Sequence, residues 1–322
     1  MNKNKFYNYI KTAVLIISLI FIYENSKKNY ESVFTNINLD YQKIFLLIAF
    51  FIIIQNLLNM RSFSFLSFTS KYSANFIQWS NLFYLTGLIN TSPFWGAGHI
   101  LRSYEMKKNN YSYKEYVSMY FFIFFWGSLI YSLILIFLSF LSNEVNFYHL
   151  SILLTIFTFS LIITSKIFLK LFVKISVKLT SFQFIKKIRF IDYFFKELLK
   201  LTKLSTLISN KKVLVNFLFF TVLLICFEYL SFSLIFKILF QTIDSQVLFL
   251  FFLSNFLIRC AKPLDNFIGI KESIMGLYAQ QLGLLFLEGA LIAIIWRLLA
   301  IISLVINYIF YYLVNKFLYN ET

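Results

Sequence analysis

Five ionisable residues stand within or beside strongly apolar segments of this chain, where a charge is costly: Arg102, Glu105, Glu228, Glu272 and Arg297. Arginine suits a phosphate because its planar guanidinium donates two hydrogen bonds to paired oxygens and stays charged when dehydrated. Carboxylates nearby would balance the cations or contact a cationic headgroup. These residue types predict a polar site inside a membrane, with Arg102 and Arg297 as its anion-binding groups.

A purely structural role is the competing interpretation of the same residues. Arg102 would pair with Glu105, three residues further on, and Arg297 would pair with Glu272 or Glu228. Such ion pairs would fix helix packing and bind nothing. Both roles stay open for the two arginines, whereas the structural role is favoured for Glu105 and Glu228.

Patterns typical of catalysis do not accompany these residues. The sequence contains no HExxH motif, no Walker glycine loop, no acidic metal cluster and no Ser-His-Asp order. The histidines, His99 and His149, and the cysteines, Cys226 and Cys260, are isolated from one another. We therefore expect no metal, no cofactor and no enzymatic activity, and an ATP-driven pump is disfavoured.

The composition requires a lipid environment. The 322 residues are 59% hydrophobic and 21% aromatic, too much apolar surface for one soluble core. Apolar segments of about 20 residues recur, the length that crosses ~30 Å of hydrocarbon. We predict an all-α, polytopic helical membrane protein with about seven spans, in a range of about six to eight. The expected spans are residues 9–24, 44–60, 116–141, 149–173, 213–240, 246–262 and 284–314.

The net charge of +16 lies in short basic runs beside these segments, as the positive-inside rule expects, which argues against a nucleic-acid partner. Residues 174–212 form a basic loop that we assign to the cytoplasm, and their alternation of apolar and cationic residues predicts an interfacial helix. A plain linker is the alternative. The same rule places the N-terminus, which precedes an uncleaved first span, on the cytoplasmic side of the cytoplasmic membrane.

Two polar-interrupted segments, residues 76–108 and 262–283, contain the two prolines of the chain, Pro93 and Pro263. Irregular backbone is tolerated in a membrane where protein or a watery cavity satisfies its polar groups. We therefore predict two re-entrant or broken helical elements that line a site. Since each proline is followed by a glycine and a long span, residues 44–173 and 213–314 are interpreted as halves of an internal duplication, with chance coincidence as the alternative.

The order of these landmarks resembles the integral membrane proteins that share the transmembrane region of lysylphosphatidylglycerol synthase/flippase proteins. The first landmark comprises Asn90, Pro93, Gly98, His99, Ile100, Leu101 and Arg102. The second comprises Pro263, Gly269, Ile270, Lys271, Glu272 and, in the last span, Arg297. The chain departs from the pattern at His99, where the family has an acidic residue, and at Asp265 and Asn266, where glycines are usual.

The resemblance implies a flippase-like protein of the cell envelope, a single membrane domain over residues 1–322 whose partners are membrane lipids. It would bind or translocate a phospholipid or a lipid-linked glycan at an intramembrane polar cavity. The substrate-binding residues it implies are Arg102, Arg297, Glu272, Gly98, Gly269 and Asn90. The alternative is a membrane subunit of a polyprenyl-phosphate-dependent glycosyltransferase or of an envelope-synthesis complex. Without a soluble synthase domain in these residues, aminoacyl transfer is not expected.

Overall fold

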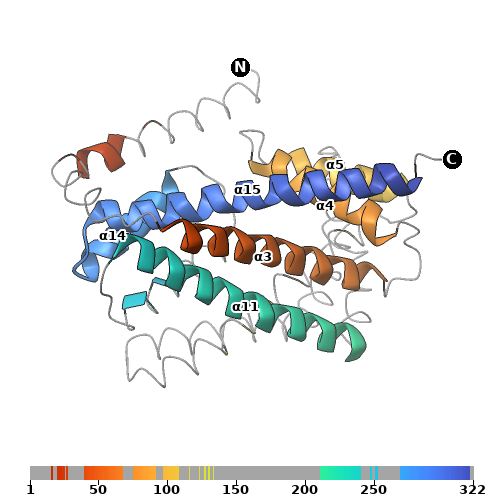
Figure 1. The fold of residues 1–322 in the computed structure, drawn as a ribbon, viewed down its shortest axis with the longest axis horizontal. Helices are drawn as coiled ribbons and strands as arrows, with labels where there is room; N and C mark the ends of the chain where they lie inside the picture. The colour runs from red at the N-terminus through yellow and green to blue at the C-terminus, as the bar shows by residue number, and fades with distance from the viewer. Residues whose placement is uncertain are drawn as a thin grey trace, which may run out of the picture. The chain divides into compact units, whose positions relative to one another are not determined.

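Nearly all of the residues that the computed structural model describes are helical. The described residues are 16, 20–25, 27, 40–67, 75–91, 97–108, 116, 123, 127, 130, 133, 211–240, 247–248, 251–252 and 269–319. The helices with defined bounds are α3 (Tyr41–Ser67), α4 (Phe76–Thr91), α5 (Ala97–Lys108), α11 (Lys211–Leu239), α14 (Ile270–Gln281) and α15 (Phe286–Tyr319) (Figure 1). No strand occurs among the described residues, and the predicted all-α class is confirmed.

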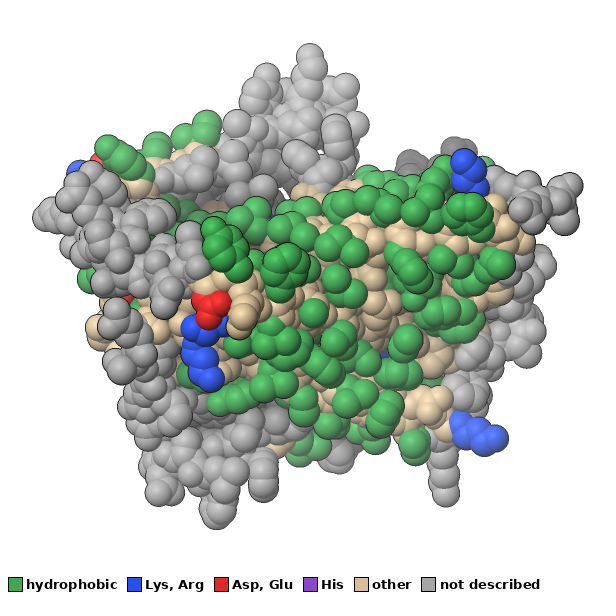
Figure 2. Space-filling model, viewed as in Figure 1, with side chains coloured by type: hydrophobic (Ala, Val, Ile, Leu, Met, Phe, Trp, Pro, Cys, Tyr) green, Lys and Arg blue, Asp and Glu red, His purple; other side chains and the backbone are tan. Residues whose placement is uncertain are grey.

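Three of these helices are long and apolar enough to cross a membrane: Tyr41–Leu66, Lys212–Leu239 and Phe286–Leu318. They contain 26, 28 and 33 residues, more than the ~20 that a span needs. On the face shown in Figure 2, hydrophobic side chains predominate among the coloured side chains, as contact with lipid requires. The chain is therefore a multi-pass helical membrane protein, and the expected spans at residues 44–60, 213–240 and 284–314 fall on these helices.

Other predicted segments lie wholly or largely outside the described residues. They are the expected spans at residues 9–24, 116–141, 149–173 and 246–262, the basic loop at residues 174–212, and both prolines. The proposed duplication and the boundaries of its halves stay predictions for the same reason.

The chain divides into two compact units. The first comprises Met1–Leu57, Ser80–Gly98 and Leu224–Thr322, and the second comprises Leu58–Trp79 and His99–Leu223. Of the predicted substrate-binding residues, Arg102 belongs to the second unit and the other five belong to the first.

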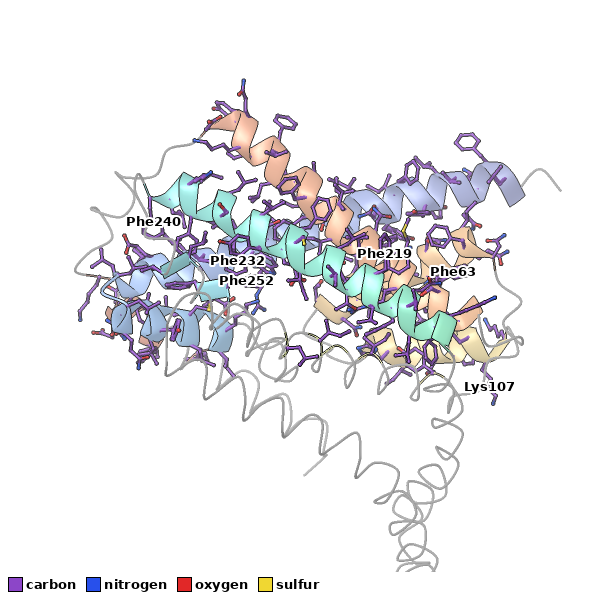
Figure 3. All side chains as sticks on the ribbon, turned by 90° about the horizontal axis from the view of Figure 1, so that it is seen from below. Phe63, Lys107, Phe219, Phe232, Phe240 and Phe252 are labelled. Carbon is purple, nitrogen blue, oxygen red and sulfur yellow. The ribbon has the colours of Figure 1, made fainter. Side chains whose placement is uncertain are left out.

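An aromatic cluster joins α3, α11 and α15 within the first unit. The Trp296 ring centroid lies 4.7 Å from that of Phe51 and 4.5 Å from that of Phe232. Phe232 also contacts Phe252, edge to face, at 5.9 Å between centroids (Figure 3). Helices in lipid are held by such close packing and not by exclusion of water. Because Trp296 precedes Arg297 in the chain, this cluster also fixes the part of α15 that carries the arginine.

A second contact in the first unit is polar, and we call Asn56, Tyr84, Asn307 and Tyr311 the asparagine cluster. The Asn56 amide nitrogen donates to Asn307 Oδ1 at 2.8 Å. The hydroxyls of Tyr84 and Tyr311 both donate to Asn56 Oδ1, at 2.9 and 3.1 Å, and their rings stack at 5.4 Å. One side chain of α3 therefore holds α4 and α15 by hydrogen bonds that lipid cannot supply.

Glycines permit a close approach of α14 to α15. A β-carbon on Gly289 would overlap the carbonyl oxygen of Met275 and lie 2.7 Å from the β-carbon of Ala279. A β-carbon on Gly276 would lie 2.6 Å from Cε2 of Phe286. Contacts this short are excluded for real side chains, so small residues set the distance between these two helices.

Candidate functional site

The first group of candidate residues lies at the start of α14. Gly269 has a φ of 93°, in the left-handed region that side chains rarely adopt, so glycine is required there. Its N–H donates to Oε2 of Glu272 at 2.7 Å, and its carbonyl accepts from the N–H of Ser273 at 2.9 Å. The predicted glycine therefore serves backbone geometry, and Glu272 caps the helix that this glycine begins.

The other carboxylate oxygen of Glu272 binds α15. Oε1 lies 2.9 Å from Nε of Arg297, and the exposed fractions of the two side chains are 4% and 22%. A buried carboxylate is retained only when its charge is compensated, and here the guanidinium and the helix start both contribute. Of the two partners considered for Arg297, the structure shows Glu272. The other, Glu228, is buried in α11, and Lys271, the residue before Glu272, is a buried cation of α14.

Arg102, on α5 in the second unit, is 3% exposed. The central carbon of its guanidinium lies 5.7 Å from the ring centroid of Trp79, which is fully buried in α4. A cation above an indole ring is attracted to it, by about 2 kcal/mol where water is excluded. The α4 residue Trp79 therefore supports and orients a buried guanidinium.

Glu105, the partner expected for Arg102, forms an ion pair with Lys108 at 2.7 Å. Their side chains are 32% and 55% exposed, so this pair lies on the outer surface of α5 and contributes little to stability. The hydrogen bond that Lys108 donates to the Glu105 carboxylate raises the pKa of Lys108 above its ordinary value. The favoured structural role of Glu105 therefore concerns Lys108, while Arg102 faces the interior.

Asn90, near the end of α4, and Gly98, in the first turn of α5, are the remaining candidate residues. A β-carbon on Gly98 would overlap the carbonyl oxygen of Thr86 and lie 2.7 Å from Oδ1 of Asn90. Gly98 therefore permits close packing of the first turn of α5 against the last turns of α4. Oδ1 of Asn90 is buried by this approach and has no hydrogen-bond partner among the described residues.

The predicted interruption of residues 76–108 corresponds to two short helices. α4 ends at Thr91 and α5 begins at Ala97, and their lengths of 16 and 12 residues are each below the length of a span. In the second broken element, α14 also contains 12 residues. Pro93 and Pro263 themselves lie outside the described residues.

Two polar features have no counterpart among the sequence candidates. His99 stands where the family pattern has an acidic residue, and its Nδ1 lies 2.9 Å from the hydroxyl of Tyr116. Arg61, on α3 in the second unit, is 9% exposed, donates from Nη1 to Oγ1 of Thr221 at 3.4 Å and lies 5.3 Å from the ring centroid of Phe217. A lone arginine inside an apolar run is a sequence signal that identifies Arg61.

Three helices long and apolar enough to cross a membrane, together with the contacts of arginine side chains with aromatic rings and a carboxylate, define an all-α, multi-pass membrane protein. Residues 9–306 match the family described as lysylphosphatidylglycerol synthase TM region, and the chain belongs to this family. No curated protein and no solved structure matches the chain. The family resemblance drawn from the landmarks around Arg102 and Arg297 is thereby confirmed.

Proposed function

We propose that this protein binds a lipid phosphate inside the membrane and moves the lipid, a phospholipid or a lipid-linked glycan, between leaflets. The observation that carries the proposal is the burial of Arg102 against Trp79 on a helix too short to span the bilayer. Family membership supports a flippase-like role. The proposal includes residence in the cytoplasmic membrane with the N-terminus inside, and transport in place of catalysis.

The chemistry of the guanidinium favours an anionic ligand. Arginine cannot lose its proton in the apolar interior, so it must meet compensating charge or polar groups there. A phosphate offers paired oxygens to the planar fork of N–H groups, and a neighbouring ring restricts the orientation of that fork. Arg61 repeats this arrangement over Phe217 in the same unit, and we include it as a second phosphate-binding group.

Arg297 has a different place in the proposal. Its contact with Glu272 compensates its charge within the protein, and this pair positions α14 against α15. Because 22% of its side chain is exposed, Arg297 is retained as a candidate for contact with an anionic headgroup. Arg102 and Arg297 belong to different units and are tested separately.

The experiment is lipid exchange in reconstituted vesicles. The full chain is placed in vesicles that contain fluorescent phosphatidylglycerol or a fluorescent polyprenyl-phosphate lipid, and a membrane-impermeant reductant reports the lipid in the outer leaflet. Arg102→Gln removes hydrogen bonds to a charged group worth about 1.5 to 3 kcal/mol, so exchange should fall about 10- to 100-fold. Arg102→Lys should recover part of it, and Arg61→Gln and Arg297→Gln are measured beside it.

Lys316→Gln is the matched control, because Lys316 is an exposed cation near the end of α15. It should exchange lipid at the rate of the unsubstituted protein. Unfolding in detergent is measured for each variant, so that loss of the fold is separated from loss of transport. Exchange of neither lipid by the unsubstituted protein contradicts the proposal, as does full exchange by a folded Arg102→Gln variant.

A further inference from the structure

Four exposed residues define what we call the outer face of α5: Ile100, Tyr104, Lys107 and Lys108. Their spacing of four, three and one places them on one side of the helix. Ile100 and Tyr104 are 72% and 58% exposed, although both are large apolar side chains. The residues of the opposite side, Gly98, Arg102, Ser103 and Met106, are buried.

This outer face is suited neither to water nor to the bilayer core. The 12 residues of α5 extend about 18 Å, well below the ~30 Å of hydrocarbon, so α5 does not span. Exposed Ile100 would be unfavourable in water, and exposed Lys107 would be unfavourable deep in lipid. A helix in the plane of the membrane interface suits both kinds of side chain, because its apolar side chains enter the acyl boundary while its cations reach the headgroups.

The arrangement of the cations favours an anionic headgroup. Lys107 extends from the end of α5 in Figure 3, and Nζ of Lys108 lies 4.8 Å from the ring centroid of Tyr104. Tyrosine is typical of the membrane–water boundary, and lysine stems extend along apolar surface toward phosphates. Glu105 is the acidic residue of α5, and its exposed ion pair with Lys108 is weak enough to exchange for a lipid phosphate.

We propose that the outer face of α5 docks on anionic phospholipid headgroups, with Ile100 and Tyr104 in the acyl boundary and Lys107 and Lys108 on the phosphates. This surface is separate from the phosphate site proposed at Arg102, because Arg102 lies on the buried side of the same helix. Docking would hold α5 at the level of the headgroups whether or not the protein moves lipid.

Depth is tested by spin labelling of the full chain in lipid nanodiscs. Ile100→Cys is labelled in a chain with Cys226→Ser and Cys260→Ser, and the accessibility of the label to oxygen and to a water-soluble nickel chelate is compared. We expect greater access to oxygen, as at the acyl boundary. A label at Lys107→Cys should show the reverse. Greater nickel access at residue 100 would overturn the proposal.

Headgroup preference is tested by native mass spectrometry of lipids retained from nanodiscs with equal phosphatidylglycerol and phosphatidylcholine. Lys107→Gln with Lys108→Gln should lower the preference for phosphatidylglycerol about 30-fold, or about 5-fold for each lysine. Arginine at both positions should preserve the preference, and Glu105→Gln, which removes the competing carboxylate, should raise it. An unchanged preference in a folded double glutamine variant would overturn the anionic partner, even if the label lies in lipid.

Discussion

Replacing Asn56 by leucine should weaken the first unit, because Asn56 joins α3 to two other helices. Three hydrogen bonds connect its side chain to Tyr84, Asn307 and Tyr311. Side-chain hydrogen bonds between membrane helices contribute about 0.6 kcal/mol each on average, and at most about 1.7. Leucine is similar in size and leaves little cavity, so the free energy of unfolding should fall by about 2 kcal/mol.

The measurement is reversible unfolding of the full chain in bicelles, with Asn216→Leu as the matched control. Asn216 is exposed on α11, so the same change there should alter the free energy of unfolding by less than about 0.5 kcal/mol. Tyr84→Phe and Tyr311→Phe remove one hydroxyl each and should cost about 0.6 kcal/mol apiece. The double variant Asn56→Leu with Tyr84→Phe should lose less stability than the sum of the two single losses, because both changes remove the same hydrogen bond between Tyr84 and Asn56.

Equal stability of Asn56→Leu and Asn216→Leu would refute the reasoning. The asparagine cluster would then be a consequence of helix packing and not one of its causes. Additive losses in the double variant would contradict the specific bond between Tyr84 and Asn56, even if each single change were destabilising.

Gly98→Ala should destabilise the protein by about 1 to 3 kcal/mol in the same unfolding assay, because the added β-carbon would overlap the backbone of α4. Gly127→Ala is the control and should be neutral or stabilising, because its β-carbon would meet no atom within 4 Å. Glu272→Gln should cost about 3 kcal/mol by removing the carboxylate that binds Arg297, and adding Arg297→Leu should recover part of that loss. The hydrogen bond from Lys43 lowers the pKa of Asp40, which precedes α3 and accepts from the first amides of that helix. This stabilisation should persist above the ordinary carboxyl range, near pH 3.9, and disappear as pH falls through the lower folded value. Asp40→Asn should abolish the pH dependence of the protection factors of the first-turn amides, which compare the exchange rate with the intrinsic rate at the same pH.

The spans were predictable because hydrophobicity is a local property of the chain. Residues 44–60, 213–240 and 284–314 needed no knowledge of their neighbours to be recognised as membrane helices. The partner of Arg297 was predictable as one of two carboxylates, since a cation within an apolar span requires compensation. The choice between Glu272 and Glu228 depends on how α14 packs against α15, and that distance is set by glycines whose effect appears only in three dimensions.

The partner of Glu105 shows a different limit of sequence reasoning. Arg102 precedes it by three residues and Lys108 follows it by three, so spacing alone does not distinguish them. The structure adds the burial of each cation: Arg102 faces the interior, while Lys108 lies on the surface and forms an ion pair with Glu105. The bonds of Asn56 were equally hidden, since Tyr311 lies 255 residues further along the chain.

The two oxygens of Glu272 couple the integrity of one helix to the position of another. If α15 slid by one residue, about 1.5 Å, the 2.9 Å contact between Arg297 Nε and Glu272 would break unless the Glu272 side chain followed. A side chain that followed would leave the Gly269 N–H, and one that stayed would lose the compensation of its charge by Arg297. Unwinding of the first turn of α14 would equally release Arg297. Conformational changes of low energy should therefore carry α14 and α15 as one rigid body, with bending confined to segments outside this pair.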